Sequence, residues 1–142
     1  MREPLLTYRG AVYPWHCDHM GHMNVMWYVG KFDEATWNLF GRLGLTPQFL
    51  RDTGRGMAAV EQNIAYKKEL MAGDIVTVHS AILEIKDRVI RFAHQMRRTD
   101  SDEEVATTTI TAVHLDTKMR RATPFPAEIR TRIQALATPA GG

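Results

Sequence analysis

The sequence predicts an α+β fold in which an antiparallel sheet of about five strands wraps around one long central helix. The first observation behind this prediction is a helical pattern of apolar residues that runs through residues 25–43. The second is the change, from residue 57 onward, to β-branched and alternating segments separated by short turns. Because strands joined by hairpin-length connections pair antiparallel, the later segments are expected to form one sheet beside the helix.

The helical segment carries its apolar residues at alternating steps of four and three, which is the spacing of one helix face. That face comprises Val25, Val29, Phe32, Thr36, Leu39 and Leu43. A second apolar row comprises Met26, Trp37 and Phe40, and a narrow polar stripe comprises Lys31, Glu34, Asn38 and Arg42. A helix that is apolar over most of its circumference is expected to be mostly buried. Asn24 is suited to cap its N-terminus, and Gly41 or Gly44 is suited to end it.

Five segments are predicted to be strands, because they are rich in β-branched residues or alternate in polarity. These segments are residues 5–13, 57–70, 73–85, 89–98 and 105–115. The fourth alternates most clearly, since Ile90, Phe92, His94 and Met96 share one face. Residues 99–104 are expected to turn. The strands from residue 73 onward carry apolar residues on both faces, which predicts that both faces of the sheet are covered.

The composition is that of an ordinary globular protein, with 142 residues, 44% of them hydrophobic and 24% charged. One domain is expected over residues 1–142, with a frayed tail at 136–142. Cys17 is the single cysteine, so no disulfide can form within the chain, and a reducing compartment, the cytoplasm, is expected. No signal peptide or membrane span is predicted. A net charge of +2 with interspersed signs argues against a nucleic-acid-binding protein.

The segment "HCDHMGHMN", residues 16–24, holds three histidines, a cysteine and an aspartate. One interpretation is purely structural, with the side chains capping and packing beside the helix. A metal site is a second interpretation. It is disfavoured because all four candidate ligands, His16, Cys17, His19 and His22, come from one segment, and structural zinc usually takes two from each of two. Neither a metal nor another cofactor is therefore expected.

The third interpretation concerns Asp18, which precedes the predicted N-cap by six residues. Gly21 allows the chain to turn between them. A carboxylate is thereby expected near a helix N-terminus, where free N–H groups polarise a carbonyl oxygen or stabilise an oxyanion. A base or nucleophile beside such a site is the minimum requirement for acyl transfer.

The segment "WHCDHMGHMNVMWYVGKFDEA" resembles the opening motif of the hot-dog-fold acyl-CoA thioesterases of the 4-hydroxybenzoyl-CoA thioesterase family. The matching positions are Asp18, Gly21, His22, Asn24, Tyr28 and the pair Asp33 and Glu34. The resemblance extends to "VEQNIAYKKELMAGD", which ends in a Gly-Asp turn, and to "TPFP" before a C-terminal helix. Three positions differ from the family pattern. His16 stands where an aspartate is frequent, Val25 replaces a second asparagine, and Lys68 or Glu69 replaces a proline.

The resemblance implies a thioesterase that hydrolyses an acyl-CoA to a free acid and CoA. Asp18 is implied as the nucleophile or the general base, and the backbone N–H of Val25 as the group that polarises the thioester carbonyl. Gly21, His22, Asn24 and Tyr28 are implied to orient the loop or to line the pocket.

For the CoA phosphates, the candidate cations are Lys67, Lys68, Lys86 and Arg88, and for the acyl pocket the candidates are Trp15, Met20, Met23 and Trp27. A homodimer, or a tetramer of dimers, is implied. A hydratase or dehydratase of acyl thioesters and a non-catalytic acyl-CoA-binding protein are the alternatives.

Overall fold

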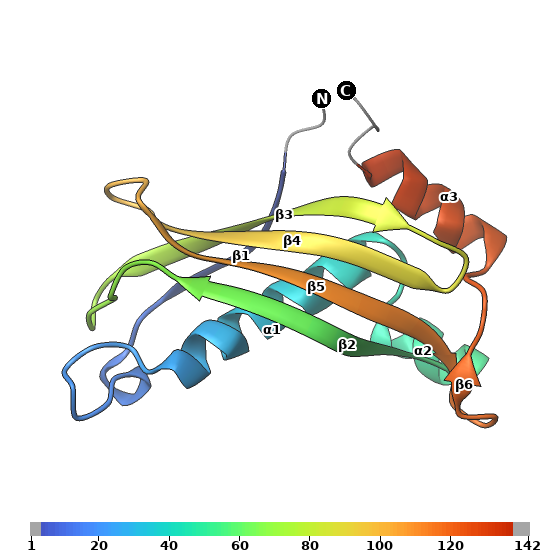
Figure 1. Ribbon diagram of the computed structural model, residues 1–142, viewed down its shortest axis with the longest axis horizontal. Helices are drawn as coiled ribbons and strands as arrows, with labels where there is room; N and C mark the ends of the chain where they lie inside the picture. Colours follow the sequence, from blue (N-terminus) through green and yellow to red (C-terminus); the bar gives the residue numbers. More distant parts are fainter. Residues whose placement is uncertain (1–3, 138–142) are drawn as a thin grey trace.

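The computed structural model describes residues 4–137 and confirms the α+β prediction (Figure 1). Five long strands form an antiparallel sheet in the order β1-β3-β4-β5-β2, and the two-residue strand β6 pairs with β5. The strands are β1 Leu5–Ala11, β2 Arg55–Tyr66, β3 Ile75–Ile85, β4 Val89–Arg98, β5 Glu104–Asp116 and β6 Arg121–Ala122. The helices are α1 Val25–Arg42, α2 Pro47–Thr53 and α3 Ala127–Leu136, with a short 3-10 turn at Pro14–His16. None of the helices within residues 4–137 is long and apolar enough to cross a membrane.

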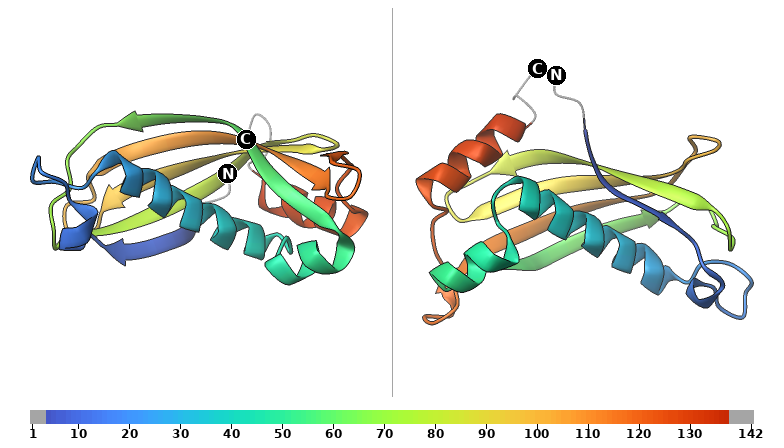
Figure 2. Two further views of the ribbon diagram at one scale, coloured as in Figure 1. Left: turned by 90° about the horizontal axis from the view of Figure 1, so that it is seen from below. Right: turned by 180° about the vertical axis from the view of Figure 1, so that it is seen from behind.

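Helix α1 lies across one face of the curved sheet, and the core fills the space between them (Figure 2). Its N-cap is Asn24, as predicted, because the Asn24 side chain accepts a hydrogen bond from the backbone N–H of Met26. The helix ends at Arg42, and Gly44 follows with a φ of +88°, a conformation that glycine adopts without strain. The inward face of β4 is also as predicted, since Ile90, Phe92, His94 and Met96 are all buried.

Lys31, which belongs to the narrow polar stripe of α1, is buried and only 2% exposed. Its aliphatic stem is buried, while the Nζ atom donates hydrogen bonds to Tyr8 Oη at 3.0 Å and to the carbonyl oxygen of Ala11 at 3.2 Å. Burial lowers the pKa of the Lys31 ammonium. A lysine can therefore occupy the inner face of this helix because β1 supplies partners for its charge.

Strand β2 is an open edge of the sheet, and most of its residues are exposed. The outer flank of α1 beside it is also exposed, with Val25, Met26, Val29 and Trp37 between 39% and 61% accessible. Helix α1 is thus less buried in the single chain than its apolar pattern predicted. Residues of the helix and of the edge strand meet at one groove, which is lined by Met26, Val29 and Trp37 from α1 and by Met57, Ala59 and Gln62 from β2.

Several element boundaries differ from those predicted. The second strand starts at Arg55 and ends at Tyr66, so residues 67–70, which were predicted to end this strand, form a loop. Helix α2 and strand β6 were not predicted, whereas α3 matches the C-terminal helix that the resemblance implied. Leu136 is the last residue of α3 and packs against the core, and Ala137 bridges to Ile82. The rest of the predicted frayed tail lies outside the described residues.

Candidate active site

The loop of residues 17–23 folds back on itself just before α1. Cys17 and Met23 form an isolated antiparallel bridge, and the Asp18 N–H donates to the carbonyl oxygen of His22 at 3.2 Å. Gly21 closes the turn with a φ of +87°, which explains why glycine is needed at this position. The loop is anchored to the neighbouring strand connection, since the Met23 N–H donates to the carbonyl oxygen of Leu70 at 2.7 Å.

The carboxylate of Asp18 is held by two hydrogen bonds. Oδ2 accepts from the side-chain amide of Asn24 at 2.7 Å, and Oδ1 accepts from the backbone N–H of Met20 at 2.9 Å. The Asn24 amide, and next the Met20 N–H, lower the pKa of Asp18 below its usual range, so the group is ionised at neutral pH. Because Asn24 also caps α1, one residue fixes both the carboxylate and the start of the helix.

The first residue of α1 presents an unused donor beside a cavity. The Val25 N–H makes no hydrogen bond to any residue between 4 and 137. A cavity of about 210 Å³ lies at this helix end, lined by His22, Met23, Val25, Tyr28, Tyr66, Lys67, Lys68 and Glu69. An N–H group at a helix N-terminus carries a partial positive charge, so this donor is suited to a carbonyl oxygen or an oxyanion.

Tyr28 and His22 line this cavity, and their side chains have partners other than the Asp18 carboxylate. The Tyr28 hydroxyl donates to the carbonyl oxygen of Lys68 at 2.8 Å, and burial raises its pKa to about 12, so it remains protonated. The His22 Nε2 atom lies 3.6 Å from a carboxylate oxygen of Glu69. Both side chains therefore tie α1 and its preceding loop to the segment after β2.

The histidines and the cysteine of the loop point in different directions. The His16 Nδ1 atom accepts from the Tyr13 N–H at 3.0 Å, and its ring packs 4.3 Å from the Trp27 ring centroid. His19 is exposed, and Cys17 lies near the Tyr13 carbonyl oxygen. Within residues 4–137, no three side chains of the metal-binding types converge on a common point.

The four candidate CoA-binding cations fall into two groups. Lys67 and Lys68 line the cavity at the α1 N-terminus, where they pair with Glu104 and Glu103. Lys86 and Arg88 lie in the β3–β4 turn, at the opposite end of the sheet from the Asp18 loop (Figure 1). In a single chain, the structure therefore brings only the first group to the candidate site.

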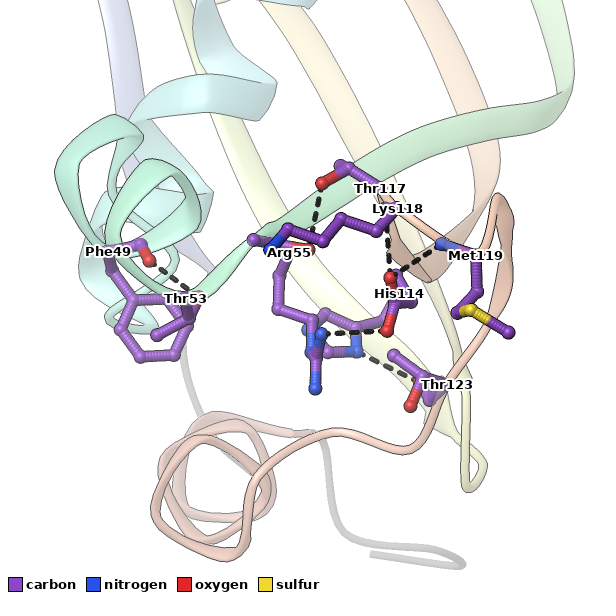
Figure 3. A network of polar contacts seen from close by, with 10 residues as sticks. Phe49, Thr53, Arg55, His114, Thr117, Lys118, Met119 and Thr123 are labelled. Atoms are coloured by element: carbon purple, nitrogen blue, oxygen red, sulfur yellow. Dashed lines mark hydrogen bonds and ion pairs between the residues drawn. The ribbon is translucent and has the colours of Figure 1, made fainter.

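Arg88 lines a polar cavity of about 390 Å³ at that opposite end, together with Arg121 and Asp116. Figure 3 shows Arg55, His114 and Thr123 in the polar network of this region, where His114 Nδ1 lies 2.9 Å from the Thr123 carbonyl oxygen. Asp116 accepts hydrogen bonds from Arg55 and from the N–H groups of Lys118 and Met119. Lys86 lines a separate cavity with Arg91. Arg91 and Arg121 were not predicted, and only a correct strand register would have placed them beside the two predicted cations.

A larger groove of about 400 Å³ runs between α1 and β2. It is lined by Met26, Val29, Gly30, Asp33, Thr36, Trp37, Phe40, Met57, Ala59, Gln62, Phe92, Ile110 and Ala112. Of the predicted acyl-pocket residues, Met23 lines the smaller cavity, and Trp15, Met20 and Trp27 line neither. Trp15 instead stacks on Tyr13 at the surface, with ring centroids 4.6 Å apart. The sequence pattern missed the groove because its residues come from four separate elements.

Known proteins are similar to this one over nearly the whole length of the chain. A betainyl-CoA thioesterase of Pseudomonas aeruginosa is 26% identical over 137 residues, which cover 96% of this chain and 86% of that protein. An L-carnitine dehydrogenase/betainyl-CoA thioesterase of Agrobacterium fabrum is 29% identical over 94% of this chain. The match spans 27% of that longer protein, so this chain corresponds to one part of it.

Solved structures show the same fold. A Staphylococcus aureus protein in complex with CoA superposes with a TM-score of 0.87 at 18% identity, over 98% of this chain and 90% of that one. A 1,4-dihydroxy-2-naphthoyl-CoA thioesterase from Synechocystis gives a TM-score of 0.82 at 20% identity, over 94% and 98% of the two chains. The family model described as the Thioesterase-like superfamily matches residues 12–133. The chain therefore belongs to the thioesterase-like superfamily and has the hot-dog fold.

Proposed function

We propose that this protein hydrolyses an acyl-CoA thioester at the N-terminus of α1, with Asp18 as the catalytic carboxylate. The observation that carries the proposal is the geometry of the loop, which holds an ionised carboxylate next to the helix start that bears the unused Val25 N–H. The relatives support the substrate class, because their names share a CoA thioester although their acyl groups differ.

The chemistry requires few groups. The Val25 N–H polarises the thioester carbonyl and stabilises the negative charge that develops on its oxygen. Asp18 acts in one of two ways. As a nucleophile, its oxygen attacks the carbonyl carbon, the carbon–sulfur bond breaks, and water hydrolyses the resulting anhydride. As a general base, it removes a proton from the water that attacks. Both routes release one acid and one CoA thiol, and neither needs a metal.

A hydratase mechanism requires a proton-transfer pair, for which Asp18 and His22 are the candidates. The support for hydrolysis is that these side chains have other partners: Asp18 binds Asn24 and Met20, and His22 faces Glu69. Thiol release separates hydrolysis from the other two candidate functions. Incubation with a panel of acyl-CoAs and a thiol-reactive dye should give thiol for a hydrolase, whereas a hydratase or a binding protein would give none.

We further propose that the complete site is shared between two copies of the chain. In one chain, the Asp18 loop and the pair Lys86 and Arg88 lie at opposite ends of the sheet. The open edge of β2 can pair antiparallel with the same edge of a second copy, and the exposed flank of α1 would then be covered. An antiparallel pairing makes the two copies run in opposite directions. The Asp18 loop of one copy would therefore lie at the same end of the dimer as the β3–β4 turn of the other copy, which carries the second pair of cations.

The first prediction from the shared site concerns mass. Light scattering at micromolar concentration should give at least twice the chain mass of 16.2 kDa. Val60 is 63% exposed on the β2 edge, so Val60→Glu should weaken the pairing and lower the mass and the activity together. Leu6→Glu, at an apolar residue that is 52% exposed on the opposite edge strand β1, is the matched control and should change neither. An active species at the mass of one chain would contradict the shared site.

The second prediction concerns the CoA phosphates. Lys86→Glu and Arg88→Glu should each raise KM more than they lower kcat, because phosphate contacts bind the substrate and the transition state alike. The effect should grow at low salt, where charge interactions are least screened. Arg9→Glu, at an exposed arginine of β1 outside both cation groups, is the control. KM values that are unchanged in both variants would remove these residues from the site.

A further inference from the structure

His16 stands at one of the positions where this chain departs from the family pattern. It is the last residue of the 3-10 turn Pro14–His16, and it is only 8% exposed. Its ring packs against Trp27 of α1 and lies edge-on to the rings of Tyr13 and Trp15, with centroids 5.7 and 5.9 Å away. The imidazole is thus enclosed by aromatic side chains at the base of the loop that carries the candidate catalytic carboxylate.

His16 is connected to the Asp18 carboxylate by two routes. Along the chain, only Cys17 separates the two residues. Through hydrogen bonds, the His16 carbonyl oxygen accepts from the Asn24 N–H at 2.9 Å, and the Asn24 side-chain amide donates to Asp18 Oδ2 at 2.7 Å. Because Asn24 also caps α1, a displacement of His16 would be transmitted both to the carboxylate and to the helix start that bears the Val25 N–H.

The imidazole fixes His16 through a hydrogen bond that requires its neutral form. Nδ1 accepts from the Tyr13 N–H at 3.0 Å, while the His16 N–H donates to the Tyr13 carbonyl oxygen at 2.9 Å. A nitrogen that accepts carries no hydrogen, so the neutral ring holds its hydrogen on Nε2. Protonation would place an N–H group of the ring opposite the Tyr13 N–H. A contact between two donors would then replace the hydrogen bond.

The charged groups that face the imidazole lie on α1. Trp27, Lys31 and Glu34 follow one another at steps of four and three, so they share one face of the helix. The Lys31 ammonium is fixed there, because it donates to Tyr8 Oη and to a backbone oxygen of β1. Burial, and next the Lys31 charge, lower the pKa of His16, whereas the Glu34 carboxylate acts in the opposite direction. The ring is therefore neutral at pH 7 and is protonated only below pH 6.5.

We infer that His16 is a positioning residue that holds the Asp18 carboxylate and the start of α1 in place only while its imidazole is neutral. The inference rests on the proposed hydrolysis at Asp18. Protonation of His16 would release the base of the loop at pH values where Asp18 is still ionised, because two hydrogen bonds lower the pKa of Asp18 from 3.8. Since a displaced carboxylate weakens transition-state stabilisation and not the binding of CoA, the loss should appear in kcat with little change in KM.

The test compares the pH profiles of the wild-type protein and of His16→Gln, measured by thiol release. In the wild-type protein, kcat should fall below pH 6.5 and approach a loss of about tenfold per pH unit once His16 is protonated. A glutamine can accept from the Tyr13 N–H, as in a capping box, and it does not titrate. The fall in kcat should therefore move to lower pH in His16→Gln. Ionisation of the substrate is common to both profiles and cannot produce this difference.

Two further measurements separate positioning from simple packing. His16→Leu fills the space without an acceptor and should lose at least about tenfold in kcat at pH 7, a loss that His16→Gln should largely restore. The comparison of His16→Gln with the wild-type protein remains decisive if the leucine variant does not fold. Nitrogen-15 spectra of the wild-type imidazole should show its hydrogen on Nε2 at pH 7, and should show protonation of Nδ1 at the pH where kcat falls.

The control is His19→Gln, which removes an exposed histidine of the same loop and should keep the wild-type profile. Circular dichroism at each pH restricts the comparison to folded protein. An unchanged profile in His16→Gln, or a hydrogen on Nδ1 at pH 7, would overturn the inference and leave hydrolysis at Asp18 intact. Absence of thiol release from every acyl-CoA at every pH would instead overturn the proposed function, and with it the inference.

Discussion

Replacement of Asp18 by asparagine should lower kcat for the best acyl-CoA substrate by a factor of about a hundred or more, the scale of a lost catalytic base or nucleophile. The substitution keeps the size and shape of the side chain and leaves an oxygen to accept from the Met20 N–H, while the hydrogen bond from the Asn24 amide is lost because both groups are then donors. It removes the negative charge that attacks the carbonyl carbon or deprotonates water. The expected result is thus a loss in kcat with little change in the melting temperature, measured by thiol release and by thermal unfolding.

The matched control for this variant is Asp52→Asn, which removes an exposed carboxylate from α2, away from the loop. It should retain the wild-type kcat. An Asp18→Asn variant that hydrolyses its substrate at nearly the wild-type rate would remove Asp18 from the mechanism. A low rate accompanied by a large fall in melting temperature would indicate that the loop, rather than the chemistry, had been changed.

The second large effect concerns stability and centres on a buried chain of hydroxyl groups and one imidazole. The His94 ring forms two hydrogen bonds: Nδ1 lies 2.6 Å from Ser80 Oγ, and Nε2 lies 2.8 Å from Thr36 Oγ1. Ser80 Oγ also lies 2.7 Å from Thr7 Oγ1. This series of hydrogen bonds links α1, β1, β3 and β4, and His94 itself is only 1% exposed. Burial lowers the pKa of His94 from 6.5 to about 4.

This shift predicts a loss of stability in mild acid. Between pH 6.5 and about 4, the unfolded chain binds a proton on this histidine that the folded chain does not. The free energy of unfolding should therefore fall as the pH falls through this window, by about 3 kcal/mol from this residue, and this contribution should level off below about pH 4. Urea unfolding measured at intervals from pH 7 to pH 4 would record the loss.

Comparison with His94→Gln isolates the residue, because burial lowers the pKa values of His16 and His114 in the same direction. The variant has a side chain that both donates and accepts hydrogen bonds but does not titrate, so its free energy of unfolding should change less over the window. His19→Gln, at an exposed histidine, should keep the wild-type pH dependence. Equal losses in the wild-type protein and in His94→Gln would contradict the assignment.

Local patterns were sufficient to predict the helix and the strands. The apolar spacing along residues 25–43, the capping side chain of Asn24 and the alternation in residues 89–98 each belong to one continuous segment, and each predicted its element correctly. Helix α2 was missed although it carries local signals, since Thr46 caps its start and Gly54 ends it with a φ of 66°. At seven residues, it is too short for a periodic apolar face to stand out.

Structural features that depend on contacts between distant segments could not be predicted from these patterns. The burial of Lys31 depends on Tyr8 and Ala11 of β1, and the buried hydroxyl chain depends on the register of three strands against α1. The Asp18 loop is an intermediate case. Its turn, its glycine and its capping asparagine lie within seven residues, so the local motif predicted their arrangement, whereas the surrounding cavity required the position of residues 66–69.

The most direct test of the proposed mechanism is the structure of the protein with an acyl-CoA analogue in which a methylene group replaces the thioester sulfur. This ketone keeps the carbonyl group and is not hydrolysed. The proposed mechanism predicts the carbonyl oxygen at hydrogen-bond distance, about 2.9 Å, from the Val25 nitrogen, with the Asp18 carboxylate facing the carbonyl carbon directly or through one water. A carbonyl group bound away from the α1 N-terminus, with Asp18 still paired only to Asn24 and Met20, would contradict it.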